Sequence, residues 1–209
     1  PEVLAAQAAR RAPVAGRALA QRGQRRAVGD GLHVVQDAFN QGVAQGDQIG
    51  RREVLRRLAL GQAMHWLVER VGPVGQQGEW PTAQCAAAAR RFALDDAQFD
   101  QARAAARRIL AGAGAWAWRE GEVRQAFDEV ELVHQGERLR IDRLVLRGAS
   151  GGEPDAWWVL DYKSAVRPEQ SPLLREQLTR YRDAVAVLHA GVRVRAAFLS
   201  ADGRLVEID

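Results

Sequence analysis

Lysine is nearly absent from this chain of 209 residues: Lys163 is the single lysine among thirty basic residues, and all the others are arginine. Cysteine is equally scarce, with Cys85 alone. One cysteine excludes an internal disulfide, a thiolate zinc site and an iron–sulfur cluster, because each of these needs more than one. A chain with these features is expected in the reducing cytoplasm.

Long apolar runs are also missing. The sequence has no uncharged apolar run of about eighteen residues, so no membrane span is expected. The first residues scatter arginine among alanine and have no apolar core, which is unlike a secretory signal. Because the chain begins with proline rather than methionine, we expect it to be a piece of a longer protein.

Positive charge is concentrated at the start of the chain. Residues 1–57 carry ten arginines against five acidic residues, whereas the remainder is nearly balanced. A basic segment can contact phosphate backbones, and it can equally be a solvated linker or helix face. We expect residues 1–50 to form an arginine-rich helical or linker segment and residues 51–209 to form the folded domain.

The hydrophobic pattern changes from helical to strand-like along the domain. The spacing of apolar residues predicts helices early in the domain and again near its end, over 51–71, 95–111, part of 113–125, and 172–190. Asp95 is the expected N-cap of the second. Alternating or continuous apolar runs predict strands over 129–134, 138–146, 156–164 and 192–200, and a short one before the end. This order predicts an α/β fold: a central mixed sheet of about four to five strands flanked by helices, with a helical N-terminal part, the last helix crossing between parallel strands.

The lone lysine lies at the end of the most apolar predicted strand. Asp161 and Lys163 are two residues apart, so they project to one face of that strand, and Tyr162 projects to the other. A carboxylate beside an ammonium is compatible with a structural ion pair and with an active site.

An acid in the middle of a neighbouring strand adds to this pattern. Asp142 lies between apolar residues, where a carboxylate is poorly placed unless it is paired or bound to metal. Two carboxylates on adjacent strands can share a divalent cation. The alternative is a surface ion pair of Asp142 with Arg143 or Arg140.

Together, Asp142 and the Asp161-Tyr162-Lys163 segment resemble the PD-(D/E)XK nuclease superfamily, which implies a restriction-endonuclease-like core. The surrounding residues are similar to the RecB-like branch, the nuclease domains of RecBCD- and AddAB-type helicase–nucleases. That branch has a Gln and a Tyr four apart on the next helix, and Gln177 and Tyr181 match. Tyr181 also fits an apolar stripe, so a simple core role stays open.

The branch also has an upstream helix with the spacing of Gly61, His65 and Glu69. We expect Gly61 to leave open space beside the imidazole of His65; alone, such a histidine is more often a plain surface residue. The branch tends to place a glutamate on the first strand. Glu129 matches, with Glu131 as the second choice, and both are also compatible with solvated acids on an edge strand.

The resemblance covers residues 51–209 and departs from the branch in two places: no glycine closely precedes Asp142, and a single cysteine excludes the iron–sulfur staple that some relatives hold. It implies Mg²⁺-dependent hydrolysis of DNA phosphodiester bonds, with Mn²⁺ as a substitute. The implied metal ligands are His65, Asp142, Asp161 and the Tyr162 carbonyl. The implied catalytic residues are Asp142, Asp161, Lys163, Gln177, Tyr181 and Glu129. Lys163 would orient water and stabilise charge on the phosphate, and a compact ammonium fits such a pocket better than a planar guanidinium.

Three functions follow as hypotheses. The first is the nuclease part of a helicase–nuclease that processes DNA ends in recombinational repair, with exonuclease expected over endonuclease. No phosphate-binding Gly-x-x-x-x-Gly-Lys-Ser/Thr loop occurs, so the helicase motor must lie elsewhere. The second and third are catalytically silent modules of the same fold, one binding DNA and one bracing a helicase partner.

Overall fold

The computed structural model of the chain describes residues 48–71, 78–149 and 152–209. The chain divides into two compact units, residues 1–43 and residues 44–209, and all described residues belong to the second unit. The expectations for residues 1–47 therefore lie outside the described part.

Helices precede the sheet and also connect two of its strands. The first group consists of α4 (Gln48–Glu69), α5 (Thr82–Arg91), α6 (Asp96–Ala111) and the 3₁₀ turn η1 (Ala115–Trp118). The strands are β1 (Val123–His134), β2 (Glu137–Arg147), β3 (Ala156–Lys163), β4 (Arg193–Ser200) and β5 (Leu205–Ile208). Between β3 and β4 the chain forms the 3₁₀ turn η2 (Pro168–Gln170) and helix α7 (Pro172–Leu188).

The sheet has five strands in the order β1-β2-β3-β4-β5. Only β3 and β4 pair in parallel, and the other neighbours are antiparallel. Helix α7 is therefore a crossover connection, as a parallel pair requires. The predicted mixed sheet flanked by helices, with β3 in its centre, is confirmed.

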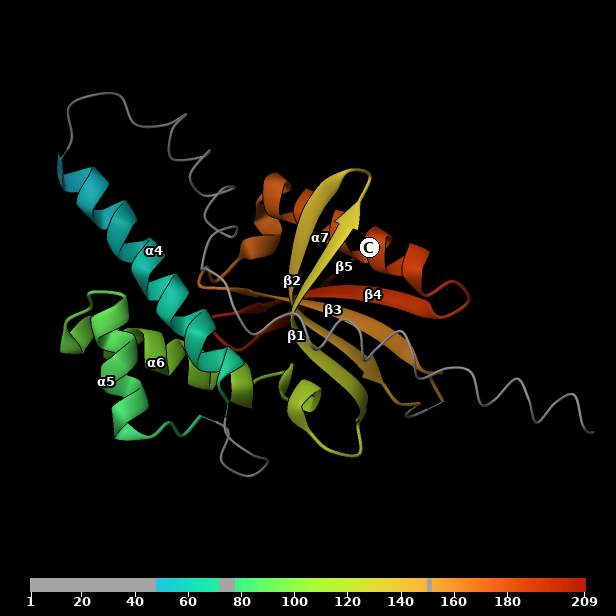
Figure 1. The fold of residues 1–209 in the computed structure, drawn as a ribbon, viewed down its shortest axis with the longest axis horizontal. Coiled ribbons are helices and arrows are strands. Elements are labelled where there is room, and N and C mark those ends of the chain that lie inside the picture. The colour runs from blue at the N-terminus through green and yellow to red at the C-terminus, as the bar shows by residue number, and fades with distance from the viewer. Residues whose placement is uncertain (1–47, 72–77, 150–151) are drawn as a thin grey trace, which may run out of the picture. The chain divides into compact units, whose positions relative to one another are not determined.

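Helices cover both faces of the sheet, α4 to α6 on one side and α7 on the other (Figure 1). Strand β3 contributes side chains to the hydrophobic clusters on both faces of the sheet, because successive side chains point to opposite faces. Trp158 and Leu160 pack in the cluster with α4, α5 and α6, whereas Trp157 and Val159 pack with α7. A strand buried on both faces explains the nearly continuous apolar run before Asp161.

Local signals set the ends of several elements. Asp95 caps α6 by accepting a hydrogen bond of 2.8 Å from the Gln98 backbone N–H, and the Asp95 backbone N–H donates one to Oε1 of Gln98. Ser171 caps α7, whose first residue is Pro172. Gln135 and Gly136 join β1 to β2 with positive φ angles of 51° and 82°, which a tight two-residue hairpin turn needs.

The structure departs from the sequence prediction in two places. Helix α5 was not predicted, because its run of alanines favours a helix but lacks large apolar residues at helical spacing. The helix expected within 113–125 is only the short turn η1, and β1 already begins at Val123. Gly112 and Gly114 lie so close to Gly203 and Leu199 that a Cβ on either would clash, so tertiary contacts set this backbone. None of the helices in the described ranges combines the length and the apolar character that a bilayer span requires.

Candidate active site

A break in the side-chain alternation of β2 directs Asp142 toward α4. Ile141 and Leu144 both pack in the cluster with α7, although residues three apart on a regular strand face opposite sides. Asp142 and Arg143 are the two residues between them, and both contact the other layer: Asp142 approaches His65 of α4, and Arg143 contacts η1. On β1, Glu129 has a φ of 55°, an uncommon conformation for a residue other than glycine.

The carboxylate of Asp142 lies where β2 and β3 stop pairing. The backbone ladder between these strands ends at Arg143 and Leu160, while β3 continues to Lys163. Two residues farther, the Tyr162 N–H donates a 2.8 Å hydrogen bond to Oδ2 of Asp142. The side chain of Asp142 therefore supplies the acceptor that the ladder no longer provides.

His65 closes the same corner from α4. Its Nε2 lies 2.7 Å from the Tyr162 carbonyl oxygen, and since a carbonyl only accepts, Nε2 carries the proton. Its Nδ1 lies 3.7 Å from Oδ2 of Asp142. Two polar side chains and one backbone carbonyl thus converge on the end of β3.

Asp161 and Lys163 form a buried pair next to this corner. Lys163 Nζ lies 2.8 Å from Oδ2 of Asp161, whose side chain is 5% exposed. Burial raises the pKa of Asp161 to about 6, with Asp142 adding to the rise and Lys163 opposing it. Burial alone would lower the pKa of Lys163, but the negative charges of Asp161 and Asp142 outweigh it, so this pKa is raised. Lys163 therefore remains an ammonium at neutral pH.

Tyr181 of α7 borders the buried pair and is joined to Gln177. The amide of Gln177 donates a 2.9 Å hydrogen bond to the Tyr181 hydroxyl. Burial, followed by the charges of Asp161 and Asp142, raises the pKa of Tyr181 to about 12. The tyrosine is buried, as its apolar stripe predicted, and it also lies close enough to sense the carboxylates.

Glu69 and Glu129 are connected through Arg140. Burial raises the pKa of Glu69, while His65, Arg70 and Arg140 oppose that rise. Arg140 forms an ion pair with Glu129. Glu131, the second choice on this strand, is exposed. A catalytic role for Glu129 stays a prediction, and the importance of Arg140 had no signal in the sequence beyond its place two residues before Asp142.

The arginines beside Asp142 have other partners. Arg143, which is 7% exposed, donates to Oδ1 of Asp128 at 2.5 Å and to the Ala117 carbonyl at 2.9 Å. Its guanidinium also stacks on Trp118. Arg140 pairs with Glu129. Asp142 therefore does not form the surface ion pair with Arg140 or Arg143 that the sequence left open as an alternative.

Gly61 does not leave open space beside His65, as the sequence had suggested. A Cβ at Gly61 would lie 3.3 Å from Oγ of Ser164. The glycine instead lets α4 approach the residue that follows Lys163. Ser164 is a contact of the site that the sequence analysis did not single out.

The donor types at the end of β3 are ones that a divalent cation accepts. Considering side chains alone, the described residues contain no group of three His, Cys, Asp or Glu able to hold an ion. The Tyr162 carbonyl oxygen is a further donor at this corner, where it accepts the 2.7 Å hydrogen bond from Nε2 of His65, and a cation would replace that proton. Carboxylate and carbonyl oxygens suit Mg²⁺, and an imidazole nitrogen shifts the preference toward Mn²⁺. The second carboxylate, Asp161, is buried beside this set with a raised pKa, and a cation would stabilise its charged form.

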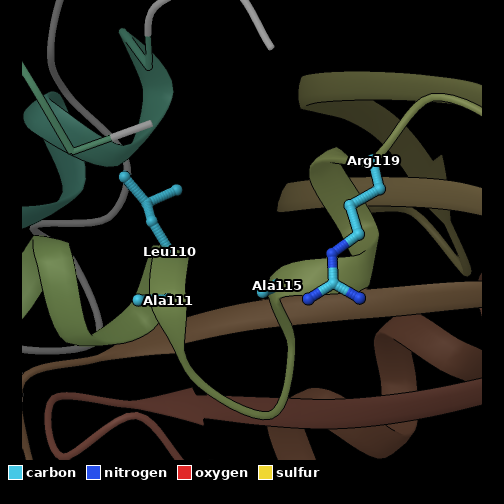
Figure 2. A pocket seen from close by; sticks show the side chains of 4 residues that line it. All are labelled: Leu110, Ala111, Ala115 and Arg119. Atoms are coloured by element: carbon cyan, nitrogen blue, oxygen red, sulfur yellow. The ribbon is translucent and has the colours of Figure 1, made fainter. Parts of the chain in front are cut away.

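A separate hollow of about 230 Å³ lies between the end of α6 and η1 (Figure 2). Its lining consists of Leu110, Ala111, Ala115 and Arg119. Arg119 extends along one side of it, opposite Leu110 (Figure 2). None of the candidate residues lines this hollow, so it is not the site built around β3.

The five-stranded mixed sheet flanked by helices is a restriction-endonuclease-like α/β fold, and two carboxylates and a lysine lie together at the carboxyl end of its central strand. The chain belongs to the PD-(D/E)XK nuclease superfamily, whose family model matches residues 40–207. Proteins of this superfamily are generally nucleases. No curated protein matches the chain.

Proposed function

We propose that this chain is a divalent-metal-dependent deoxyribonuclease domain that hydrolyses phosphodiester bonds. The observation that carries the proposal is the convergence of Asp142, Asp161, Lys163 and His65 at the end of β3. A buried carboxylate whose pKa is raised next to a second carboxylate is costly for stability, and such groups concentrate at functional sites.

The ion would be held by His65, Asp142, Asp161 and the Tyr162 carbonyl. When bound, it activates a water molecule and neutralises charge on the scissile phosphate. Lys163 stays protonated and donates hydrogen bonds to the attacking water and to the phosphate oxygen on which charge develops. Tyr181 borders Lys163 from α7, and the hydrogen bond between Gln177 and Tyr181 restricts both side chains.

We further propose the RecB-like branch for this domain. Gly61, His65 and Glu69 on α4 and the Gln177–Tyr181 pair on α7 support this assignment by their spacing. In that branch the domain accompanies a helicase, in the same polypeptide or complex, and degrades DNA ends in recombinational repair in the cytoplasm. The expected activity is Mg²⁺-dependent exonuclease action on DNA.

The test is cleavage of labelled linear DNA, single-stranded and duplex, with Mg²⁺, Mn²⁺ or EDTA. We expect metal-dependent degradation by the wild-type chain and none by Lys163→Ala. Mn²⁺ binding, measured by calorimetry, should be present in Lys163→Ala and absent in Asp142→Asn.

The two readouts separate the remaining functions. Metal binding without cleavage would indicate a nuclease that needs its helicase. DNA binding with neither metal binding nor cleavage would contradict the proposal in favour of a silent DNA-binding module.

A further inference from the structure

The first half of α4 extends past the core toward solvent. Residues 51–57 are all exposed, whereas Met64 and Leu67 farther along the helix are buried. The protruding half bears four arginines and a single acid, Glu53. This arm is continuous with the half of α4 that carries His65 (Figure 1).

Arg57 lies on α4 one turn before Gly61 and two turns before His65. At 3.6 residues per turn, Arg57 is offset by about 40° from Gly61 and by about 80° from His65 around the helix axis, so it lies on the same half of the helix. Gly61 contacts Ser164, the residue directly after Lys163. From His65, this half of α4 therefore passes the end of β3 at Gly61 and continues outward to Arg57.

The guanidinium of Arg57 is accessible for a ligand. Its side chain is 76% exposed, and it pairs at 3.0 Å with Glu53. Glu53 is also paired with Arg56, so one carboxylate serves two arginines. Exposed pairs of this kind are weak and exchange readily with another anion.

The candidate site is rich in acids and needs positive charge nearby to bind DNA. Asp142 and Asp161 are the carboxylates that act on the single ammonium of Lys163, and Glu69 lies beside His65. The carboxylates repel the phosphates of an approaching DNA strand. A cation on the open side of α4 offsets this repulsion over the next phosphates.

We propose that Arg57 binds a backbone phosphate of the DNA substrate and so defines the path by which the strand leaves the active site along α4. The proposal rests on the proposed nuclease function. Arg57 is eight residues before His65, about 12 Å along the helix axis. At 3.4 Å per phosphate of one strand, this corresponds to about three to four phosphates from the scissile bond.

Arg56 supplies a matched control for Arg57. It lies on the same helix, shares the partner Glu53, and carries the same charge, but it points about 100° away around the axis. Arg57→Ala and Arg56→Ala therefore remove the same charge and an ion pair with the same acid. Both keep helix propensity high.

The first measurement is the salt dependence of DNA binding by the full chain in EDTA. Loss of one phosphate contact should reduce the log–log salt slope of Arg57→Ala by about 0.7 on single strands or about 0.9 on duplex. Arg56→Ala should keep the wild-type slope. Equal slopes for Arg57→Ala and wild type would overturn the proposal and assign this surface to another occupant, such as an acidic protein segment.

The second measurement locates the phosphate. Single uncharged methylphosphonates are placed at each position near one mapped cleavage site, and single-turnover cleavage at that bond is followed. Neutralising the phosphate three to four positions away, on one side only, should slow the wild type several-fold and leave Arg57→Ala unaffected, because the two changes remove the same contact. Additive effects at every position would also contradict the proposal.

These outcomes are distinct from failure of the proposed function. If the wild-type chain cleaves DNA while Arg57→Ala behaves as Arg56→Ala, the path along α4 alone is wrong. If the wild-type chain binds neither metal nor DNA and does not cleave DNA, both proposals fail.

Discussion

The two adjacent parallel strands β3 and β4 carry one carboxylate–cation pair near their starting edge and another near their ending edge. The two pairs differ in how their surroundings affect the charges. At the start of β4, Arg195 bonds Glu207 at 2.7 Å and Glu153 at 2.9 Å and stacks on Trp158. At the end of β3, Lys163 contacts Asp161 at 2.8 Å. Both are carboxylate–cation pairs, but the carboxylate of Asp161 is buried and that of Glu207 is partly exposed.

The pKa of both cations is raised, and the difference between the two pairs lies in their carboxylates. Arg195 donates hydrogen bonds to Glu207, which raise the pKa of Arg195, and the carboxylate of Glu207 is 32% exposed whereas Asp161 is 5% exposed. Burial raises the pKa of Asp161 to about 6, and Asp142 adds to the rise, so its surroundings oppose the charged form despite Lys163. An ion pair selected for stability would not place a second carboxylate beside a buried one. This contrast favours function for the β3 pair and structure for the β4 pair.

The largest expected effect is on cleavage by Lys163→Arg. The ammonium is 20% exposed and in contact with Asp161, and the broader guanidinium cannot occupy this space without displacing the carboxylate. We expect single-turnover cleavage of labelled DNA to fall by about 10²–10³-fold, as for loss of one transition-state donor. The converse change, Arg195→Lys, should cleave normally. Near wild-type cleavage by Lys163→Arg would contradict the explanation for the lone lysine.

The second prediction concerns stability against pH in the metal-free protein. Between the ordinary pKa of 3.8 and about 6, folded Asp161 keeps a proton that the unfolded chain has released. The free energy of unfolding should therefore be highest below this window and fall as pH rises through it, by on the order of 2–3 kcal/mol. Glu69, whose pKa is also raised, contributes a fall of the same sign.

Urea unfolding at pH 4 and pH 7 in EDTA measures this fall. The difference between the two pH values should be smaller in Asp161→Asn than in the wild type, because the amide does not titrate. An identical difference in both proteins would show that folding does not raise the pKa of Asp161.

A smaller effect is expected for Tyr181→Phe. The ring remains buried, but the hydroxyl that accepts from Gln177 is lost. A hydrogen bond of this kind contributes about 0.5–1.5 kcal/mol to stability, so the free energy of unfolding should fall by about that amount. We expect kcat/KM to fall by a comparable free energy, about 2–10-fold, because Gln177 is no longer held. An unchanged kcat/KM would leave Tyr181 as a core residue only.

The smallest effect is expected for Arg195→Ala. It removes an exposed ion pair and the stacking on Trp158, worth about 1 kcal/mol of unfolding free energy. Thermal unfolding should show this loss while DNA cleavage stays at the wild-type rate. A strong loss of cleavage would contradict the assignment of a purely structural role to the Arg195 pair.

Much of the fold could be predicted because its signals are local. The cap at Asp95, the apolar run of β3 and the periodicity of α7 each lie within a few residues of the chain. Helix α5 and the turn η1 were missed or misjudged for the opposite reason. Helix α5 has no large apolar residues at helical spacing, and the backbone that leads into η1 is set by packing against residues far along the chain, such as Gly112 against Gly203.

The site divides in the same way. The spacing of Asp161 and Lys163 places them on one face because strand side chains alternate, and the carboxylate on the neighbouring strand was correctly expected nearby. The break in side-chain alternation at Asp142 and Arg143, which turns Asp142 toward α4, could not be predicted, because the sequence alternates regularly and the break arises from packing against neighbouring elements.

The sequence by itself determined the order of helices and strands, the pair of Asp161 with Lys163, and the resemblance to the PD-(D/E)XK nucleases, because these depend on residues close together in the chain. Only the tertiary structure decided that His65 meets the Tyr162 carbonyl across 97 residues, that Ser164 fills the space at Gly61, and that burial raises the pKa of Asp161. Such contacts and desolvation exist only after the layers have packed.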